Sequence, residues 1–161
     1  MNKIAIIIRG PAGVGKSTIG EILYKKLPRT AHVDIDLFKK MISDESSIER
    51  TNIAHDTATR LAEALEHHGF NIIVEELFRA DHLVRWKELL RTLGYETHVF
   101  FFSAPLSDLI ERDRARKIKT KGEEIIIKLY NDITPNDGEM VIDVSKLSPE
   151  LAADAVLAAL K

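Results

Sequence analysis

The sequence predicts an α/β fold in which a parallel sheet carries helices on both faces. Five runs of β-branched and aromatic residues alternate with segments whose apolar residues recur at helical spacing, and repeated strand–helix units build parallel sheets. A glycine-rich loop also separates the first run from the first helical segment, at a point where open α/β sheets commonly bind a ligand.

The first half of the chain contains three of the expected strands. Ile4–Ile8 is an unbroken apolar run, as expected for a strand buried on both faces. The helix after the glycine loop has apolar residues at helical spacing, and Pro28 ends it. The other elements expected here are a strand at 31–34, a short helix at 37–42, a long helix from the capping box at 46–49 to just before Gly69, and a strand at 71–74.

The second half repeats this alternation. A helix at 81–93 buries Leu83, Trp86 and Leu90, and Pro149 occupies the first position of the last helix. Between these two helices we expect a strand at 98–102, a helix at 106–116, a polar run at 117–124 with further helix to 130, a loop at 131–138 and a strand at 141–144.

Length and composition predict one globular domain that spans residues 1–161. The formal net charge is −2, so no bulk attraction toward nucleic acid or an anionic membrane is expected. The lack of cysteine excludes disulfides, thiolate catalysis and cysteine-ligated zinc. No window approaches the roughly 18 apolar residues of a membrane span, and the first apolar run is too short for a signal sequence. We therefore expect a cytoplasmic protein without a membrane partner.

The glycine loop carries the full pattern of a Walker A motif. Small residues let successive backbone N–H groups turn toward phosphate oxygens, and the following helix adds its positive end. In this pattern Lys16 reaches the β- and γ-phosphates, and the Ser17 hydroxyl ligates Mg²⁺. The sequence therefore predicts a binding site for a nucleoside triphosphate and Mg²⁺. The loop residues are Gly10, Pro11, Ala12, Gly13, Val14, Gly15, Lys16 and Ser17, followed by Thr18.

Other classes of nucleotide-binding protein fit the sequence less well. A GTPase needs a D-x-x-G segment, and no Asp in the chain is followed by Gly three residues later. The nearest imitation of a base-reading motif, at 120–123, lacks its Asp. Motor ATPases and helicases usually need a longer chain, although residues 72–76 imitate a Walker B strand. These observations favour a small phosphotransferase.

Three segments resemble the small P-loop kinases: the loop 10–18, Asp34-Ile35-Asp36 at the end of the second strand, and the pair Arg112 and Arg116. This group includes shikimate kinase, gluconate kinase, polynucleotide 5′-kinase and chloramphenicol phosphotransferase. Residues 73–78, followed by Arg85-Trp86, look most like the last of these. The resemblance implies a P-loop NTPase three-layer sandwich with a five-stranded parallel sheet in the order 2-3-1-4-5. It also implies a small, mobile helical lid at about 112–130.

The resemblance also implies roles for the two aspartates. Asp34 would help to hold Mg²⁺ together with Ser17, and Asp36 would accept a hydrogen bond from the attacking hydroxyl. Strand geometry agrees with this, because side chains two residues apart face the same way at a sheet edge where ligands bind. The alternative is that Asp36 caps the helix that starts at Leu37.

The expected lid would supply arginines. In the kinases that the chain resembles, Arg112 would stack on adenine and Arg116 would meet the transferring phosphoryl group, and a planar, permanently charged guanidinium suits both tasks. The alternative is a solvated helix face. The charged residues that would make up this face include Glu111, Asp113, Glu123 and Glu124, and for Lys117, Lys119 and Lys121 the solvated role is favoured.

Two features stay open at this stage. Glu75 and Glu76 follow the third strand. One of them would contact the water shell of the metal or a substrate hydroxyl, or both would have a structural or solvated role. The six histidines show no metal-ligand spacing, so no further metal site is predicted.

The leading hypothesis is an ATP-dependent phosphotransferase that moves the γ-phosphate to a hydroxyl of an unidentified small molecule. Lys16, Arg116 and Mg²⁺ would stabilise charge on the moving phosphoryl group, and Asp36 would orient the acceptor. One alternative is a polynucleotide 5′-hydroxyl kinase, but the acidic balance argues against a nucleic-acid partner. The other is a non-catalytic nucleotide-binding regulatory module, which would not need Asp36 or Arg116. The sequence predicts no oligomeric state.

Overall fold

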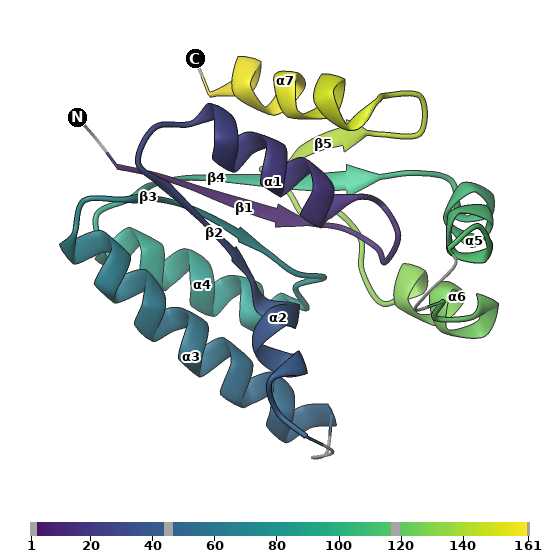
Figure 1. The fold of residues 1–161 in the computed structure, drawn as a ribbon, viewed down its shortest axis with the longest axis horizontal. Coiled ribbons are helices and arrows are strands. Elements are labelled where there is room, and N and C mark those ends of the chain that lie inside the picture. The colour runs from purple at the N-terminus through teal and green to yellow at the C-terminus, as the bar shows by residue number, and fades with distance from the viewer. Residues whose placement is uncertain (1–2, 44–46, 117–119, 161) are drawn as a thin grey trace.

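The structure, a computed structural model, describes residues 3–43, 47–116 and 120–160. Strands and helices alternate along these ranges (Figure 1). The first half contains β1 (Ile4–Arg9), α1 (Lys16–Lys26), β2 (Thr30–Asp34), α2 (Ile35–Lys40), α3 (Ser47–His67) and β3 (Asn71–Glu75). The second half contains α4 (Ala80–Thr92), β4 (Glu96–Ser103), α5 (Leu106–Arg114), α6 (Glu123–Asn131), β5 (Met140–Asp143) and α7 (Pro149–Ala159).

The five strands form one parallel sheet in the order β2-β3-β1-β4-β5, which confirms the predicted fold class and strand order. β1 lies at the centre, paired with β3 on one side and with β4 on the other. The register sets Glu75 of β3 beside Ile8 of β1 and Asp34 of β2. The carboxyl ends of these three strands therefore meet at one edge of the sheet, where ligands bind in such folds.

Helices cover both faces of the sheet and give the fold three layers (Figure 1). Alternate residues of β1 face opposite ways. Ile6 and Ile8 pack with α1 and α7, and Ala5 and Ile7 pack with α3 and α4. All four are at most 1% exposed, and each buried isoleucine contributes roughly 1.5–3 kcal/mol. The sheet is therefore a well-packed support for the segments at its edge.

The helix expected at 37–42 begins earlier, at Ile35. The Asp34 side chain accepts a hydrogen bond from the backbone N–H of Asp36 at 2.9 Å and is the N-cap of α2. Asp34, and not Asp36, therefore has the capping role that the sequence offered as the alternative for Asp36.

The helix expected at 106–116 ends at Arg114, so Arg116 lies beyond α5. Near the end of α5, the Asp113 carboxylate accepts hydrogen bonds from the backbone N–H groups of Lys121 and Gly122. Three residues of the sequence predictions lie outside the described residues, namely Ser46, Lys117 and Lys119.

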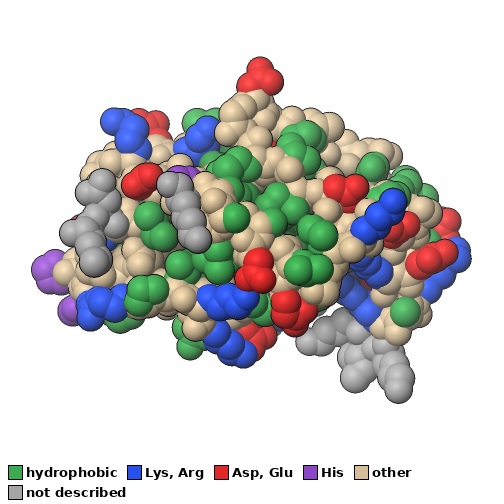
Figure 2. Space-filling model, turned by 90° about the horizontal axis from the view of Figure 1, so that it is seen from above, with side chains coloured by type: hydrophobic (Ala, Val, Ile, Leu, Met, Phe, Trp, Pro, Cys, Tyr) green, Lys and Arg blue, Asp and Glu red, His purple; other side chains and the backbone are tan. Residues whose placement is uncertain are grey.

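The face formed by α1 and α7 carries acidic and basic side chains interspersed with hydrophobic ones (Figure 2). This mixture agrees with the near-neutral formal charge of −2. In the described part of the chain, no helix combines the length and the apolar character that a membrane crossing requires.

Candidate active site

A cavity of about 450 Å³ opens at the carboxyl edge of the sheet. This volume lies within the range of small-molecule sites. The glycine loop forms one wall, β2 and α2 form another, and the segment after β3 forms a third. The lining residues are Ala12, Gly13, Gly15, Lys16, Ser17, Thr18, Asp34, Asp36, Lys39, Lys40, Thr51, Glu75, Glu76, Leu77, Arg79, His82, Arg116, Lys121 and Leu129.

The glycine loop has the backbone conformation that its motif requires. Gly10, Gly13 and Gly15 have φ values of 149°, 85° and 102°, which favour glycine. A Cβ atom added to Gly10 would lie 2.4 Å from the carbonyl oxygen of Phe102, so the close approach of the loop to β4 needs glycine. Gly15 is the N-cap of α1, and the positive end of that helix therefore faces the cavity.

Lys16 is the cation at the centre of this wall. Its Nζ donates hydrogen bonds to the carbonyl oxygens of Gly10 and Pro11, at 2.9 and 3.0 Å. Burial lowers the pKa of Lys16, although the charges of four nearby carboxylates act to raise it. These carboxylates belong to Glu75, Asp36, Glu76 and Asp34, in order of decreasing effect.

Glu75 and Asp34 form an acidic pair beside the loop. Glu75 is 1% exposed, and neither of its carboxylate oxygens has a hydrogen-bond partner among the described residues. His32 Nε2 lies 3.4 Å from Glu75 Oε1. Burial and the charges of Glu75 and Asp36 raise the pKa of Asp34. Buried negative charge of this kind calls for a cation, and Mg²⁺ takes oxygen ligands, so the residues present fit Mg²⁺.

Asp36 lies on the opposite wall, with a side chain that is 55% exposed. Lys39 Nζ donates to Asp36 Oδ1 at 3.0 Å and also to Glu76 Oε1. Burial would raise the pKa of Glu76, but hydrogen bonds from His55 and Lys39, together with the charge of Lys39, outweigh it and lower this pKa to about 2. Burial likewise opposes the charge of Lys39, yet Glu76 and Asp36 raise its pKa. Glu76 and Lys39 therefore form an ion pair in which both side chains are charged.

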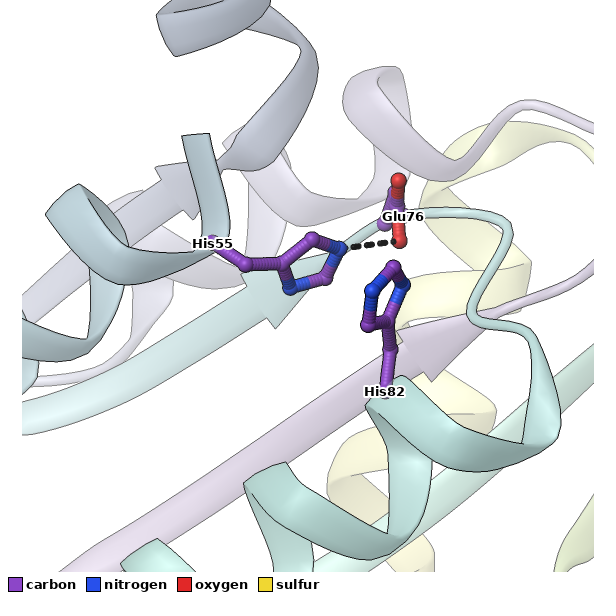
Figure 3. A group of neighbouring side chains, drawn as sticks. All are labelled: His55, Glu76 and His82. Atoms are coloured by element: carbon purple, nitrogen blue, oxygen red, sulfur yellow. Dashed lines mark hydrogen bonds and ion pairs between the residues drawn. The ribbon is translucent and has the colours of Figure 1, made fainter. Parts of the chain in front are cut away.

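Two histidines flank Glu76, His55 from α3 and His82 from α4 (Figure 3). The indole Nε1 of Trp86 can only donate, and it donates to His55 Nδ1 at 3.0 Å. Neutral His55 therefore carries its proton on Nε2 and donates it to Glu76 Oε2 at 3.0 Å. The His82 ring stacks on His55 with centroids 3.8 Å apart. Burial and the neighbouring His55 lower the pKa of His82.

The side chains of His55, Glu76 and His82 have ligand-type atoms within 4.8 Å of one another. Their hydrogen bonds nevertheless oppose metal binding. The proton on His55 Nε2 leaves no lone pair there, and the Lys39 ammonium already offsets the Glu76 charge. We therefore describe this group as a hydrogen-bonded cluster and not as a metal centre.

α5 and α6 lie beyond the carboxyl ends of β1 and β4 (Figure 1). Arg116 and Lys121 line the cavity. Arg112 lies outside the described lining, and its Nη2 donates to the carbonyl oxygen of Val144 at 3.4 Å, just after β5. Asp113, which the alternative interpretation placed on a solvated helix face, is instead buried and 3% exposed. Hydrogen bonds from the backbone N–H groups of Lys121 and Gly122 lower the pKa of Asp113.

The segment after β3 is held by a buried arginine. Phe78 is fully buried with a φ of 53°, which is strained for a bulky residue. Its carbonyl oxygen accepts from Arg9 Nη2 at 3.1 Å, and Arg9 Nη1 binds Glu139 Oε2 at 2.8 Å. This contact fixes the path of the chain into Arg79, whose Nη2 binds Asp132 Oδ2 at 2.8 Å.

Five residues that the sequence singled out, Lys16, Ser17, Asp34, Asp36 and Arg116, line the same cavity. The sequence did not single out Lys39, His55 or His82 as members of the site. For Lys39 a signal exists, since its i, i+3 spacing from Asp36 places both on one helix face. His55 and His82 come from separate helices, and no local pattern predicts that they meet.

Comparison with known families identifies one whose model matches most of the chain. The family model AAA_33, described as an AAA domain, matches residues 6–128, which run from β1 into α6. The cytidylate kinase of Listeria welshimeri is 30% identical over 105 residues, which make up 63% of this chain and 45% of that kinase. The chain thus spans less than half the length of this curated relative.

Solved kinase structures share the fold over almost the whole chain. The APS kinase of Mycobacterium tuberculosis has a TM-score of 0.78 and 18% identity, covering 99% of this chain and 98% of that one. A gluconokinase from Sinorhizobium meliloti has a TM-score of 0.74 and 16% identity, covering 98% and 93%. The resemblance to small P-loop kinases that the sequence predicted is therefore confirmed at the level of the fold.

Proposed function

We propose that this chain, which belongs to the AAA_33 family of AAA domains, is a kinase that transfers the γ-phosphoryl group of ATP to a hydroxyl of a small molecule. One observation carries the proposal: Lys16 of the glycine loop, Asp36 of α2 and Arg116 line a single cavity. The M. tuberculosis APS kinase, which has the same fold, was solved in complex with AMPPNP and APS.

The glycine loop would form the donor side of the site. Its backbone N–H groups and the Lys16 ammonium bind phosphate oxygens, and Lys16 exchanges its present carbonyl partners for them. Ser17, Asp34 and Glu75 would hold Mg²⁺, whose charge offsets that of the β- and γ-phosphates. Arg112, which binds the segment after β5, is proposed to contact the adenine.

Asp36 would form the acceptor side. Its carboxylate accepts a hydrogen bond from the acceptor hydroxyl and aims the oxygen at the γ-phosphorus. As the new O–P bond forms, the bond from the γ-phosphorus to the bridging oxygen breaks and ADP leaves. The hydroxyl proton passes to the Asp36 carboxylate and then to solvent, and the Arg116 guanidinium stabilises charge on the moving group.

The match to a cytidylate kinase makes a nucleoside monophosphate a second acceptor class to test. The pairing of two lining cations favours a hydroxyl. A phosphate acceptor needs cations to bind it, whereas Lys39 already binds two carboxylates and Arg79 already binds Asp132. A phosphate acceptor would therefore have to bind Lys40 or Lys121, which also line the cavity. We also propose that residues of about 112–130, which include α6, act as a lid over the nucleotide.

The test is transfer of label from γ-labelled ATP to a panel of acceptors. The panel contains hydroxyl metabolites, nucleosides, aminoglycoside- and phenicol-type compounds, cytidylate and oligonucleotides with a 5′-hydroxyl. We expect a small hydroxyl compound to be labelled. Asp36→Asn should lower kcat by about 10²- to 10⁴-fold, as loss of an acid–base group does, and the exposed-residue control Asp137→Asn should not. If no acceptor is labelled and Asp36→Asn leaves ATP turnover unchanged, the proposal should be dropped. If only cytidylate or only oligonucleotides are labelled, that class of acceptor replaces the small hydroxyl compound in the proposal.

A further inference from the structure

Lys39 is more deeply buried than the Asp36 carboxylate, which is proposed to bind the acceptor. Its side chain is 19% exposed, whereas that of Asp36 is 55% exposed. Lys39 Nζ donates to Asp36 Oδ1 at 3.0 Å, so the second oxygen, Oδ2, is the one left for an acceptor hydroxyl. Because the two residues are three apart on α2, the contact closes within one turn of helix.

Glu76 binds the Lys39 ammonium from its buried side. One oxygen of the Glu76 carboxylate accepts from Lys39 Nζ, and the other accepts from His55 Nε2 at 3.0 Å. The side chain of Glu76 is 6% exposed and that of His55 is 1% exposed. A carboxylate with both oxygens occupied in this way cannot rotate without breaking a buried hydrogen bond, which is costly in a low-dielectric interior.

The direction of these bonds is fixed at the far end by Trp86, which can only donate. The indole Nε1 donates to His55 Nδ1 at 3.0 Å, so His55 must donate through Nε2 to Glu76. The group Trp86, His55, Glu76 and Lys39, hereafter the Lys39 relay, joins α4, α3, the end of β3 and α2. It runs from Trp86 in the hydrophobic core to Lys39, beside the Asp36 carboxylate that is proposed to bind the acceptor.

We propose that Lys39 is a positioning residue for Asp36, and that the buried residues Glu76, His55 and Trp86 hold Lys39 in place for this task. The inference rests on the proposed phosphotransferase function. Through the contact at Oδ1, Lys39 sets the rotamer of Asp36 and so the direction in which Oδ2 presents the acceptor hydroxyl. A displacement of about 1 Å in such a group costs about 10²-fold in rate.

A purely structural role predicts a different result. If the Lys39 relay only holds α2 against the sheet, loss of Lys39 lowers stability and affects nucleotide binding and turnover together. If Lys39 positions Asp36, its loss lowers kcat while the KM for ATP is unchanged, because the glycine loop is not touched.

The kinetic experiment compares Lys39→Met, Lys39→Arg and the exposed control Lys87→Met. We expect Lys39→Met to lower kcat by about 10- to 100-fold with the KM for ATP within about twofold of wild type. Lys39→Arg, which keeps the charge and can donate to both carboxylates, should recover part of this loss, and Lys87→Met should behave as wild type. An unchanged kcat in Lys39→Met would overturn the proposal, and so would a parallel loss of kcat, ATP binding and folding in Lys39→Met with no recovery in Lys39→Arg.

A second readout needs no acceptor. Trp86 is the one tryptophan of the chain, so its indole N–H gives a single, assignable NMR signal at the far end of the relay. We expect Lys39→Met and Asp36→Asn to shift this signal, whereas Lys25→Met, at an exposed position on α1, leaves it in place. If Lys39→Met does not fold, Lys39→Arg and Asp36→Asn supply the comparison.

The two readouts separate the two proposals. An indole signal that responds to Lys39 and Asp36 in a protein that labels no acceptor would uphold the relay and reject the phosphotransferase function. An indole signal that ignores both changes would reject the relay, whatever the activity.

Discussion

Glu75 and Glu76 are neighbours in the chain, but their side chains have different surroundings. Glu75 lies beside Asp34 and near His32, whose ring packs against Gly20 of α1. Glu76 binds Lys39 and His55 on the side of α2 and α3. Successive residues at a strand end face opposite ways, so under the proposed function Glu75 would serve the donor side of the cavity and Glu76 the acceptor side.

At the same scale, Lys16 provides the most direct test of nucleotide binding. ATP and Mg²⁺ at 100 times the Kd should stabilise the wild type by about 2.7 kcal/mol, which raises Tm by roughly 5–10 °C for a chain of this size. Lys16→Ala should abolish this rise, because the cation that meets the phosphates is gone. Lys25→Ala on the exposed side of the same helix is the control and should keep the full rise. A Tm rise that survives in Lys16→Ala would remove the assignment of the phosphate loop.

Gly10 makes a second prediction about a single residue. A Cβ atom at Gly10 would meet the Phe102 carbonyl oxygen at 2.4 Å, whereas one at Gly94 would meet nothing within 4 Å. Both glycines have positive φ, but the 149° of Gly10 is less accessible to a side chain than the 76° of Gly94, so the collision and the backbone strain both act at Gly10. Gly10→Ala should lower the free energy of unfolding by about 1–3 kcal/mol more than Gly94→Ala does, as measured by urea denaturation. Equal losses in the two variants would contradict this reading of the loop.

The donor side could be predicted from the sequence because its residues are contiguous. The loop from Gly10 to Thr18 carries one contiguous motif, and the spacing of that motif predicts its backbone geometry. The support of Asp36 could not be predicted in the same way. Lys39, His55, Glu76 and Trp86 meet only because α2, α3, β3 and α4 pack together, and no local spacing records that packing.

At the scale of elements, α5 and α6 are joined through one buried carboxylate. Asp113, at the end of α5, accepts backbone hydrogen bonds from Lys121 and Gly122 at 3.0–3.1 Å, just before α6 begins. The joint explains why α5 ends two residues earlier than expected. It also gives the proposed lid a defined point of attachment.

This joint should depend on pH. The folded pKa of Asp113 is lowered from the ordinary value of 3.8, so its stabilising effect is complete above that value and is lost as the pH falls through the lower folded pKa. Hydrogen exchange of the Lys121 and Gly122 amides should therefore be slow at neutral pH and lose its protection below about pH 3.8.

Asp113→Ala, which removes the acceptor, should show fast exchange of these amides at neutral pH. Asp113→Asn keeps one acceptor oxygen but cannot ionise, so its exchange should be faster than in wild type and show no acid-induced change. Asp108→Asn on the same helix is the control. Protection that is equal in wild type and Asp113→Asn at pH 7 would show that the carboxylate does not hold α6.

The order and type of the elements were predictable, but their ends were less so. Apolar periodicity and the prolines at positions 28 and 149 gave the alternation of strands and helices. The start of α2 depends on the Asp34 cap and the end of α5 on the Asp113 contacts. Both are side-chain hydrogen bonds that an apolar pattern does not contain.

At the scale of the whole molecule, a buried ion pair ties distant parts of the chain together. The side chains of Arg9 and Glu139 are 3% and 2% exposed. Arg9 also donates to the carbonyl oxygens of Thr134 and Phe78. The central strand is thereby joined to the segment after β3 and to the loop before β5.

Loss of this ion pair should lower the stability of the folded protein. Arg9→Met leaves the Glu139 carboxylate buried without its partner and should lower the free energy of unfolding by about 3–5 kcal/mol. The double variant Arg9→Met with Glu139→Gln should recover part of this loss, because no uncompensated charge remains. Urea denaturation of both variants measures the difference, and a double variant less stable than Arg9→Met would contradict the explanation.

The division of the cavity between chain segments has a consequence for inheritance. The acceptor wall, from Asp36 through Lys39 and Glu76 to His82, lies in one uninterrupted stretch of the chain, whereas the glycine loop, Asp34 and Arg116 lie outside it. Under the proposed function, a lineage could acquire a new acceptor by changes in that stretch alone, provided that Glu75 is kept. The other residues proposed to bind ATP and Mg²⁺ would stay the same.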